Sequence, residues 1–166
     1  MSIVRRLARP MFASMFVLGG ADAFRHPEAR ATLAAPVAKK IAAVLPVQLP
    51  EDPVQLIRMD AAVKVLGGLL FATGRQPRLA ALALGASLIP TTLAGHSFWE
   101  YDDAAQRASQ RIHFFKNVSL LGGCLLAAVD TEGRPSVGYR ARKVSQLTGR
   151  RARKAAKTAR KSLPGD

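Results

Sequence analysis

The chain has 166 residues, enough for one domain, and carries 25 Lys and Arg against 11 Asp and Glu, a formal net charge of +14. Nearly half of it, 49%, is hydrophobic and only 22% is charged, an unusual composition for a soluble domain. The single cysteine, Cys124, excludes an internal disulfide or a CxxC redox pair.

The positive charge is concentrated near the C-terminus. From Arg134 onward eleven Lys and Arg accompany one acid, Asp166, whereas the first 133 residues carry fourteen basic and ten acidic groups. The sequence therefore divides into a nearly neutral apolar body, 1–133, and a basic tail, 134–166. Such tails bind polyanions, and anionic lipid and nucleic acid are the two candidates.

Apolar runs in the body predict four membrane-spanning helices, over about 7–24, 54–73, 79–95 and 112–129. The third run has seventeen residues and no charge, close to the roughly twenty that span a bilayer. In the first run, Ala21-Asp22-Ala23 imitates the cleavage site of a signal peptide, and cleavage would leave three spans. The proline at position 10 and the acid at position 22 argue against cleavage.

The second run is the most polar, because Arg58, Asp60 and Lys64 lie within it. Asp52 followed by Pro53 is typical of an N-cap and a first-turn proline, so a helix is expected to begin there. Asp60 and Lys64 are spaced i,i+4 and share one helix face. We therefore predict that they form a structural ion pair.

Basic residues predict the orientation of the spans. Arg5, Arg6 and Arg9 precede the first span, Arg75 and Arg78 lie between the second and third, and the basic tail follows the fourth. With an even number of spans, the positive-inside rule places these regions and both termini in the cytoplasm.

Three Leu-Gly-Gly sequences, at 18–20, 66–68 and 121–123, fall in the first, second and fourth runs. Small residues let membrane helices approach closely. We therefore expect these glycines to mark helix contacts.

The predicted outer side has loops at 25–53 and 96–111 and collects most of the polar residues that border the spans. These residues are Asp22, Asp60, Lys64, His96, Glu100, His113, Lys116 and Asn117. Ionisable residues within membrane spans are costly and tend to mark function. The bias predicts an all-α, up-down four-helix bundle with a polar vestibule facing outward.

Several interpretations of this vestibule remain open. In a structural one, the charges pair within the bundle, and Trp99 and Tyr101 anchor the interface. In a second, a quinone or small ligand binds against an aromatic wall, with a histidine for its carbonyl oxygen and a carboxylate to relay protons. The catalytic candidates are then His96, Glu100 and His113, and the ligand-binding set is Asp22, Lys64, His96, Trp99, Glu100, His113, Lys116 and Asn117.

A metal site and a substrate pathway complete the interpretations. His96 and Glu100 would share a face if the third helix continued past Gly95, and His113 would add a third ligand. Because no HExxH-like motif is present, we assign no metal to these residues.

Several short motifs resemble the DoxX family of membrane proteins. They are Gly-Gly-Ala-Asp-Ala-Phe-Arg-His-Pro-Glu (19–28), Pro-Thr-Thr (90–92), His-Ser-Phe-Trp (96–99) and Phe-Phe-Lys-Asn (114–117). Gly122-Gly123 and the run 128–136 are similar to the actinobacterial branch, and the resemblance covers about Arg5 to Arg140.

The resemblance implies a small four-helix, multi-pass protein of the bacterial inner or plasma membrane that is associated with redox systems. Relatives include subunits of thiosulfate:quinone oxidoreductase, and one member is linked to a superoxide dismutase and a sulfurtransferase. No agreed catalytic residues carry over from the family to positions in this chain.

Two functions of different class follow. In the first, the protein is a membrane component of a quinone-linked complex in redox, oxidative-stress or sulfur metabolism, with quinone as the candidate cofactor. In the second, it is a non-catalytic anchor that recruits soluble redox or sulfur-transfer proteins. Nothing resembles a nucleotide, flavin or haem site, so the chain is at most a subunit of an oxidoreductase.

The basic tail contains Val144 and Leu147 as its few apolar contacts. Each basic group near an anionic leaflet contributes about 1 kcal/mol, so the tail is expected to bind anionic lipid. A solvated tail is the alternative. Nucleic-acid binding has no support beyond the charge.

Overall fold

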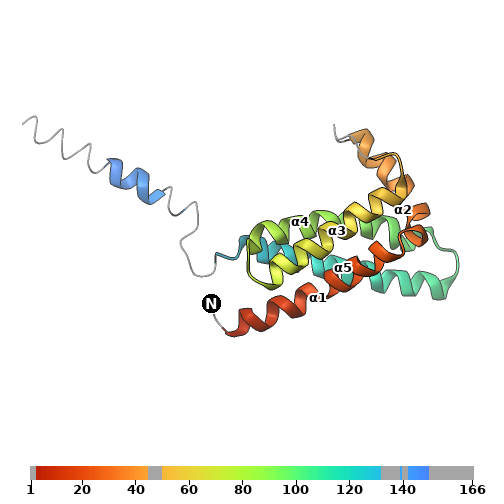
Figure 1. The fold of residues 1–166 in the computed structure, drawn as a ribbon, viewed down its shortest axis with the longest axis horizontal. Coiled ribbons are helices and arrows are strands. Elements are labelled where there is room, and N and C mark those ends of the chain that lie inside the picture. Colours follow the sequence, from red (N-terminus) through yellow and green to blue (C-terminus); the bar gives the residue numbers. More distant parts are fainter. Residues whose placement is uncertain (1–2, 45–49, 132–138, 140–141, 150–166) are drawn as a thin grey trace, which may run out of the picture. The chain divides into compact units, whose positions relative to one another are not determined.

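The computed structural model describes residues 3–44, 50–131, 139 and 142–149 and divides the chain into two compact units, Met1–Asp130 and Thr131–Asp166. In the first unit the described elements are α1 (Ile3–Arg25), α2 (Glu28–Val44), α3 (Pro53–Ala72), α4 (Pro77–Gly95), the 3₁₀ turn η1 (Phe98–Glu100) and α5 (Ala104–Val129) (Figure 1). In the second unit residues 142–149 are helical, and most of the basic tail lies outside the described residues. The prediction of an all-α fold is confirmed for the described part of the chain.

Helix starts follow the capping chemistry of the sequence. Asp52 caps α3 by accepting a hydrogen bond from the backbone N–H of Val54 at 2.9 Å, and Pro53 is the first helical residue, as predicted. Asp103 caps α5 in the same way, accepting from the N–H of Gln106 at 2.7 Å. Since this cap precedes the apolar run, α5 begins two turns before the predicted span at 112.

Helix α2 is absent from the sequence-based interpretation, which treated 25–53 as an outer loop. The segment lacks a clean apolar stripe and contains Pro36, yet its many alanines favour a helix. Contacts with α3 and α4 hold α2 at the end of the unit opposite the described start of α1 (Figure 1).

The four longest helices pack in the order α1, α3, α4, α5, each against the next (Figure 1). Glycines occupy the closest approaches. A Cβ on Gly20 of α1 would lie 2.9 Å from the Cβ of Lys64, one on Gly68 of α3 would lie 2.6 Å from Val17 Cγ2, and one on Gly123 of α5 would lie 2.6 Å from Phe12 Cε2. The expectation that the Gly-Gly pairs mark helix contacts is therefore confirmed for these three glycines.

The expectation is wrong for the other member of two pairs. A Cβ on Gly19 or Gly122 would meet nothing within 4 Å. The reason is geometric, since consecutive helical residues point about 100° apart and two neighbours cannot both face the same partner helix.

The packing of the first unit places small residues inside and large apolar residues outside. Its buried cluster consists of Ala13, Phe16, Phe71, Ala80, Ala81, Leu84, Leu88, Cys124 and Ala128. Large apolar side chains stand exposed along the same helices, among them Met11, Leu18, Leu66, Leu70, Leu79, Leu82, Ile89, Leu93, Leu125, Leu126 and Val129. Large apolar side chains exposed in this number are typical of a surface that contacts lipid or protein rather than water.

Among the described residues, two helical segments are long and apolar enough to cross a membrane by length and composition, Pro77–Glu100 and Ala104–Val129. With 19 residues, α4 is about 28 Å long at 1.5 Å per residue, close to the thickness of a bilayer core. The helices over the other two predicted spans, α1 and α3, carry Arg9, Asp60 and Lys64 in buried or half-buried positions. The four-span topology stays a prediction.

Candidate functional site

The end of α4 brings two histidines together. His96 is the C-cap of α4, and its backbone N–H donates to the carbonyl of Thr92 at 2.9 Å. Its ring Nδ1 lies 2.7 Å from Oε1 of Gln110 on α5. The imidazole stacks on that of His113, one turn further along α5, with centroids 5.2 Å apart and planes at 25°. The two catalytic candidates from different helices are therefore neighbours.

Lys116 and Asn117 continue this group along α5. The Lys116 ammonium lies 3.3 Å from Nδ1 of His113, and the lysine is exposed. Asn117 is buried, at 7% exposed, and its amide donates to Thr92 Oγ1 at 3.1 Å. Polar contacts at this end therefore join α4 to α5 twice, through His96 and, one turn earlier on α4, through Thr92.

Asp60 and Lys64 form a second, deeper group between α3 and α4. Lys64 donates to the Asp60 carboxylate and, at 2.6 Å, to Thr91 Oγ1. The hydroxyl of Ser87 donates to the other Asp60 oxygen. The exposed fractions are 10% for the lysine side chain and 27% for the aspartate side chain. The charges are thus compensated by each other and by two hydroxyls of α4.

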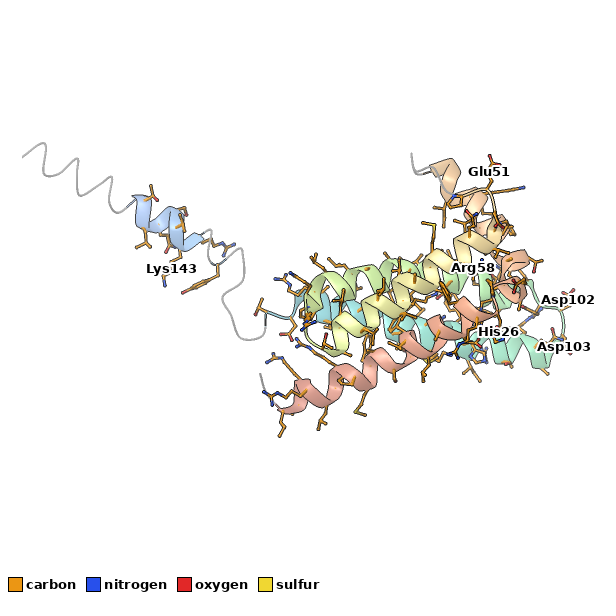
Figure 2. All side chains as sticks on the ribbon, viewed as in Figure 1. His26, Glu51, Arg58, Asp102, Asp103 and Lys143 are labelled. Carbon is orange, nitrogen blue, oxygen red and sulfur yellow. The ribbon has the colours of Figure 1, made fainter. Side chains whose placement is uncertain are left out.

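Asp22 lies in a separate cluster that ties α1 to α2. Its carboxylate is 3.3 Å from Nδ1 of His26 and 2.5 Å from a guanidinium nitrogen of Arg30. His26 is at the same end of the unit as the Asp102–Asp103 turn (Figure 2). No described contact joins Asp22 to His96, so the structure does not bring Asp22 into the histidine group.

Trp99 and Glu100 sit on η1, outside α4. Trp99 packs edge-on against Phe98 and Phe114, at centroid distances of 5.1 and 5.7 Å, and remains 53% exposed. Glu100 is exposed. Since α4 ends at Gly95, as the predicted span 79–95 does, the helix continuation on which the metal interpretation depended is absent. The described residues contain no group of three or more His, Cys, Asp or Glu placed to hold a metal ion.

Sequence reasoning missed several polar members of these groups, namely Gln110, Ser87, Thr91 and Thr92. Gln110 fell in a predicted loop, before the predicted fourth span. Ser87 and Thr91 are spaced i,i+4 in an otherwise apolar run, a spacing that puts two hydroxyls on one face of α4. This spacing is visible in the sequence, but the Asp60 carboxylate to which the two hydroxyls hydrogen-bond belongs to a different helix.

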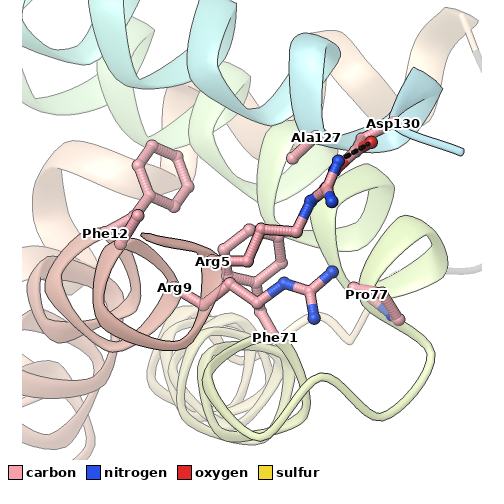
Figure 3. A pocket seen from close by; sticks show the side chains of 8 residues that line it. Arg5, Arg9, Phe12, Phe71, Pro77, Ala127 and Asp130 are labelled. Carbon is pink, nitrogen blue, oxygen red and sulfur yellow. Dashed lines mark hydrogen bonds and ion pairs between the residues drawn. The ribbon is translucent and has the colours of Figure 1, made fainter. Parts of the chain in front are cut away.

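A pocket of the first unit, lined by described residues, lies at the other end of α4. It is lined by residues of α1, α3, α4 and α5, including Arg5, Arg9 and Asp130, and its volume is about 240 Å³ (Figure 3). Its place was not predicted.

These features define a small all-α protein whose apolar exterior and compensated internal charges suit a membrane. The model of the DoxX family matches residues 5–97, more than half of the chain, and the chain belongs to this membrane-associated family. Comparison with curated proteins and with solved structures found no match.

Proposed function

We propose that this DoxX protein is a multi-pass component of the plasma membrane that serves a quinone-linked redox complex in oxidative-stress or sulfur metabolism. Both termini are cytoplasmic, residues 1–133 hold four spans, and 134–166 form a basic tail that contacts anionic lipid. The His96 end of the first unit then faces outward and carries the quinone or small-ligand site.

The observation that carries this proposal is the pairing of His96 with His113 across α4 and α5. Oε1 of Gln110 accepts from Nδ1–H of His96, which leaves Nε2 of the neutral ring as the acceptor for the hydroxyl of a reduced quinone. Next to the pair stands the exposed ammonium of Lys116, 3.3 Å from His113. This cation favours a quinone oxygen that gains electron density on reduction.

The residues of this end fit a quinone head group in hydrogen-bonding character and in surroundings. A bound quinone would supply two-electron redox chemistry at this position. His96 Nε2 would accept from the hydroxyl of the reduced head group, Lys116 supplies positive charge, and the exposed ring of Trp99 offers a flat apolar surface. Glu100, on the same turn as the tryptophan, is the remaining candidate for proton exchange with water.

The deeper group has a structural role in this proposal. Lys64 and Asp60 fix α3 against α4 through Thr91 and Ser87, and Asn117 fixes α5 through Thr92. These contacts hold the ends of α4 and α5 in the register that lets His96 meet His113.

The test is a quinone that co-purifies with the protein in detergent. Organic extracts of wild type, His96→Ala and His26→Ala are analysed by mass spectrometry, and each protein is titrated with the soluble quinone menadione. His26 is a matched control because it is an exposed histidine of the Asp22 cluster. We expect bound quinone in wild type and His26→Ala and its loss in His96→Ala. Equal quinone content in all three proteins would refute the assignment.

A non-catalytic anchor for soluble redox or sulfur-transfer partners is the second candidate. It is favoured by one observation: within the described part of the chain, no buried side-chain polar atom lacks a hydrogen-bond partner. The buried polar side chains of the described part are therefore satisfied within the protein. Partner capture that is unchanged in His96→Ala, with no cofactor in either protein, would support the anchor.

A further inference from the structure

The two stacked histidines of α4 and α5 have chemically different partners at the same ring position. Nδ1 of His96 lies 2.7 Å from Oε1 of Gln110, and Nδ1 of His113 lies 3.3 Å from Nζ of Lys116. An amide oxygen only accepts hydrogen bonds, whereas an ammonium only donates them. The partner of each ring therefore determines which of its two nitrogens carries the proton when the imidazole is neutral.

Opposite tautomers follow for the two rings. Because Oε1 of Gln110 accepts, Nδ1 of His96 carries the proton and Nε2 holds the lone pair. Because Lys116 donates, Nδ1 of His113 holds the lone pair and Nε2 carries the proton. Within the described part of the chain both rings use Nδ1 for these contacts, so the pair offers a ligand one Nε2 acceptor, on His96, and one Nε2–H donor, on His113.

The two rings also differ in how they can take up a further proton. A proton added to neutral His96 goes to Nε2, and Nδ1–H continues to donate to Gln110. A proton added to neutral His113 would replace the lone pair on Nδ1, which faces the ammonium of Lys116. That addition would end the hydrogen bond and set two like charges side by side. His96 is therefore the member of the pair that can receive a proton from a ligand.

The charged side chains of the neighbouring elements leave this asymmetry in place. On η1, Glu100 is exposed and has no described contact with either ring. On α3, Asp60 and Lys64 pair with each other, and on α2, Arg30 pairs with an acid of α1. In the part of the chain that the structure describes, the charge in contact with the histidines is thus that of Lys116.

We propose that Gln110 and Lys116 are positioning residues that set opposite tautomers, so that each histidine binds one redox form of the quinone. This inference rests on the proposed function and refines it. Nε2 of His96 accepts from the hydroxyl of the reduced head group. When that O–H bond breaks, the proton passes to Nε2 and the oxygen keeps the electron pair. Nε2–H of His113 donates to the carbonyl oxygen of the oxidised head group.

The first measurement is nitrogen NMR of the full chain in detergent, isotope-labelled at its histidines. Spectra are recorded at about pH 8.5, where an ordinary imidazole is neutral. Ring nitrogens with and without a proton resonate far apart, so the spectrum reports the tautomer directly. His96→Gln and His113→Gln assign the signals. We expect Nδ1–H for His96 and Nε2–H for His113, and the same tautomer on both rings would overturn the inference.

Variants of Gln110 test whether this residue sets the tautomer of His96. Gln110→Leu removes the acceptor and should move the proton from Nδ1 to Nε2, whereas Gln110→Glu keeps an oxygen acceptor and should preserve Nδ1–H. Gln106→Leu is the matched control, because Gln106 is an exposed glutamine one turn earlier on α5. An unchanged His96 spectrum in Gln110→Leu would refute the positioning role.

Variants of Lys116 test the second ring in the same way. Lys116→Met removes the donor and should place part of the His113 proton on Nδ1. Arg111→Met removes an exposed charge of the same helix and should leave the His113 spectrum unchanged. Equal spectra for Lys116→Met and wild type would refute the role of Lys116.

Ligand binding separates this inference from the quinone site itself. Menadione and its reduced form, menadiol, are titrated without oxygen into wild type, Gln110→Leu and Gln110→Glu. Gln110→Leu should weaken menadiol binding about fivefold, the scale of one neutral hydrogen bond, without weakening menadione binding, and Gln110→Glu should restore most of the loss. Equal weakening of both forms would overturn the inference. Binding of neither form to wild type would refute the quinone site and the ligand roles of both histidines, while the tautomers seen by NMR would stand.

Discussion

The contact between α1 and α3 at Gly20 allows the packing of this fold to be tested with a matched pair of variants. A Cβ added at Gly20 would lie 2.9 Å from Lys64 Cβ, 3.0 Å from the carbonyl oxygen of Ala61 and 3.0 Å from Val65 Cγ2. The backbone oxygen and the β-carbon cannot move without α3 itself. A Cβ at Gly19, the preceding residue, meets nothing within 4 Å.

The magnitude follows from two terms. Replacing glycine by alanine inside a helix gains up to about 1 kcal/mol in helix propensity, and both variants share this gain. Only Gly20→Ala adds overpacking, which costs about 1–3 kcal/mol when the surroundings are fixed. We therefore expect the free energy of unfolding of Gly20→Ala to lie about 1–3 kcal/mol below that of Gly19→Ala.

The measurement is reversible unfolding in mixed micelles with increasing SDS, followed by helical circular dichroism. Comparison of the two variants, rather than of each with wild type, removes the shared propensity term. If their free energies of unfolding agree within about 0.5 kcal/mol, the usual spread for surface substitutions, the close approach of α1 and α3 at this level is wrong.

Two further predictions concern the polar groups between the helices. Asp60→Asn leaves the Lys64 charge, whose side chain is 10% exposed, without its counter-ion and should lower the free energy of unfolding by about 2–4 kcal/mol. The double variant Asp60→Asn/Lys64→Met should recover most of that loss in the same SDS titration. A double variant no more stable than the single one would contradict this. Thr92→Val removes the acceptor of the buried Asn117 amide and should lower the free energy of unfolding by about 1–2 kcal/mol. Asn117→Leu should lower it by less than about 1 kcal/mol, because Thr92 still donates to the carbonyl of Leu88 at 2.6 Å. Equal losses of stability in a thermal melt would refute this asymmetry.

Local capping chemistry made parts of the fold predictable. The start of α3 at Pro53 follows from Asp52 and the proline, because the capping carboxylate and the backbone N–H that donates to it are two residues apart. Helix α2 was not predictable from apolar periodicity, since its sequence shows little, and contacts with α3 and α4 stabilise it. The early start of α5 was not predicted, because the turns that follow Asp103 are polar and precede the apolar run.

The site shows the same division between local and long-range information. The i,i+4 spacing of Asp60 and Lys64 indicates a shared face, and the structure places the two side chains in contact. The hydroxyl partner Ser87 lies 27 residues away from Asp60, at a distance in sequence set by how α3 and α4 align. Which glycine of each pair faces a neighbour, and which histidine meets which, likewise depends on helix rotation that spacing alone does not specify.

The distribution of side-chain sizes in the first unit reverses the usual pattern of tolerance to substitution. In a water-soluble domain the large apolar core is constrained and the surface varies freely. Here an added carbon at Gly20, Gly68 or Gly123 would force a neighbouring group to move, while exposed positions such as Leu82 and Leu126 need only remain apolar. Random mutagenesis of this chain should therefore find Leu, Ile, Val and Phe freely interchangeable on the outer face, with the strictest limits on its smallest residues.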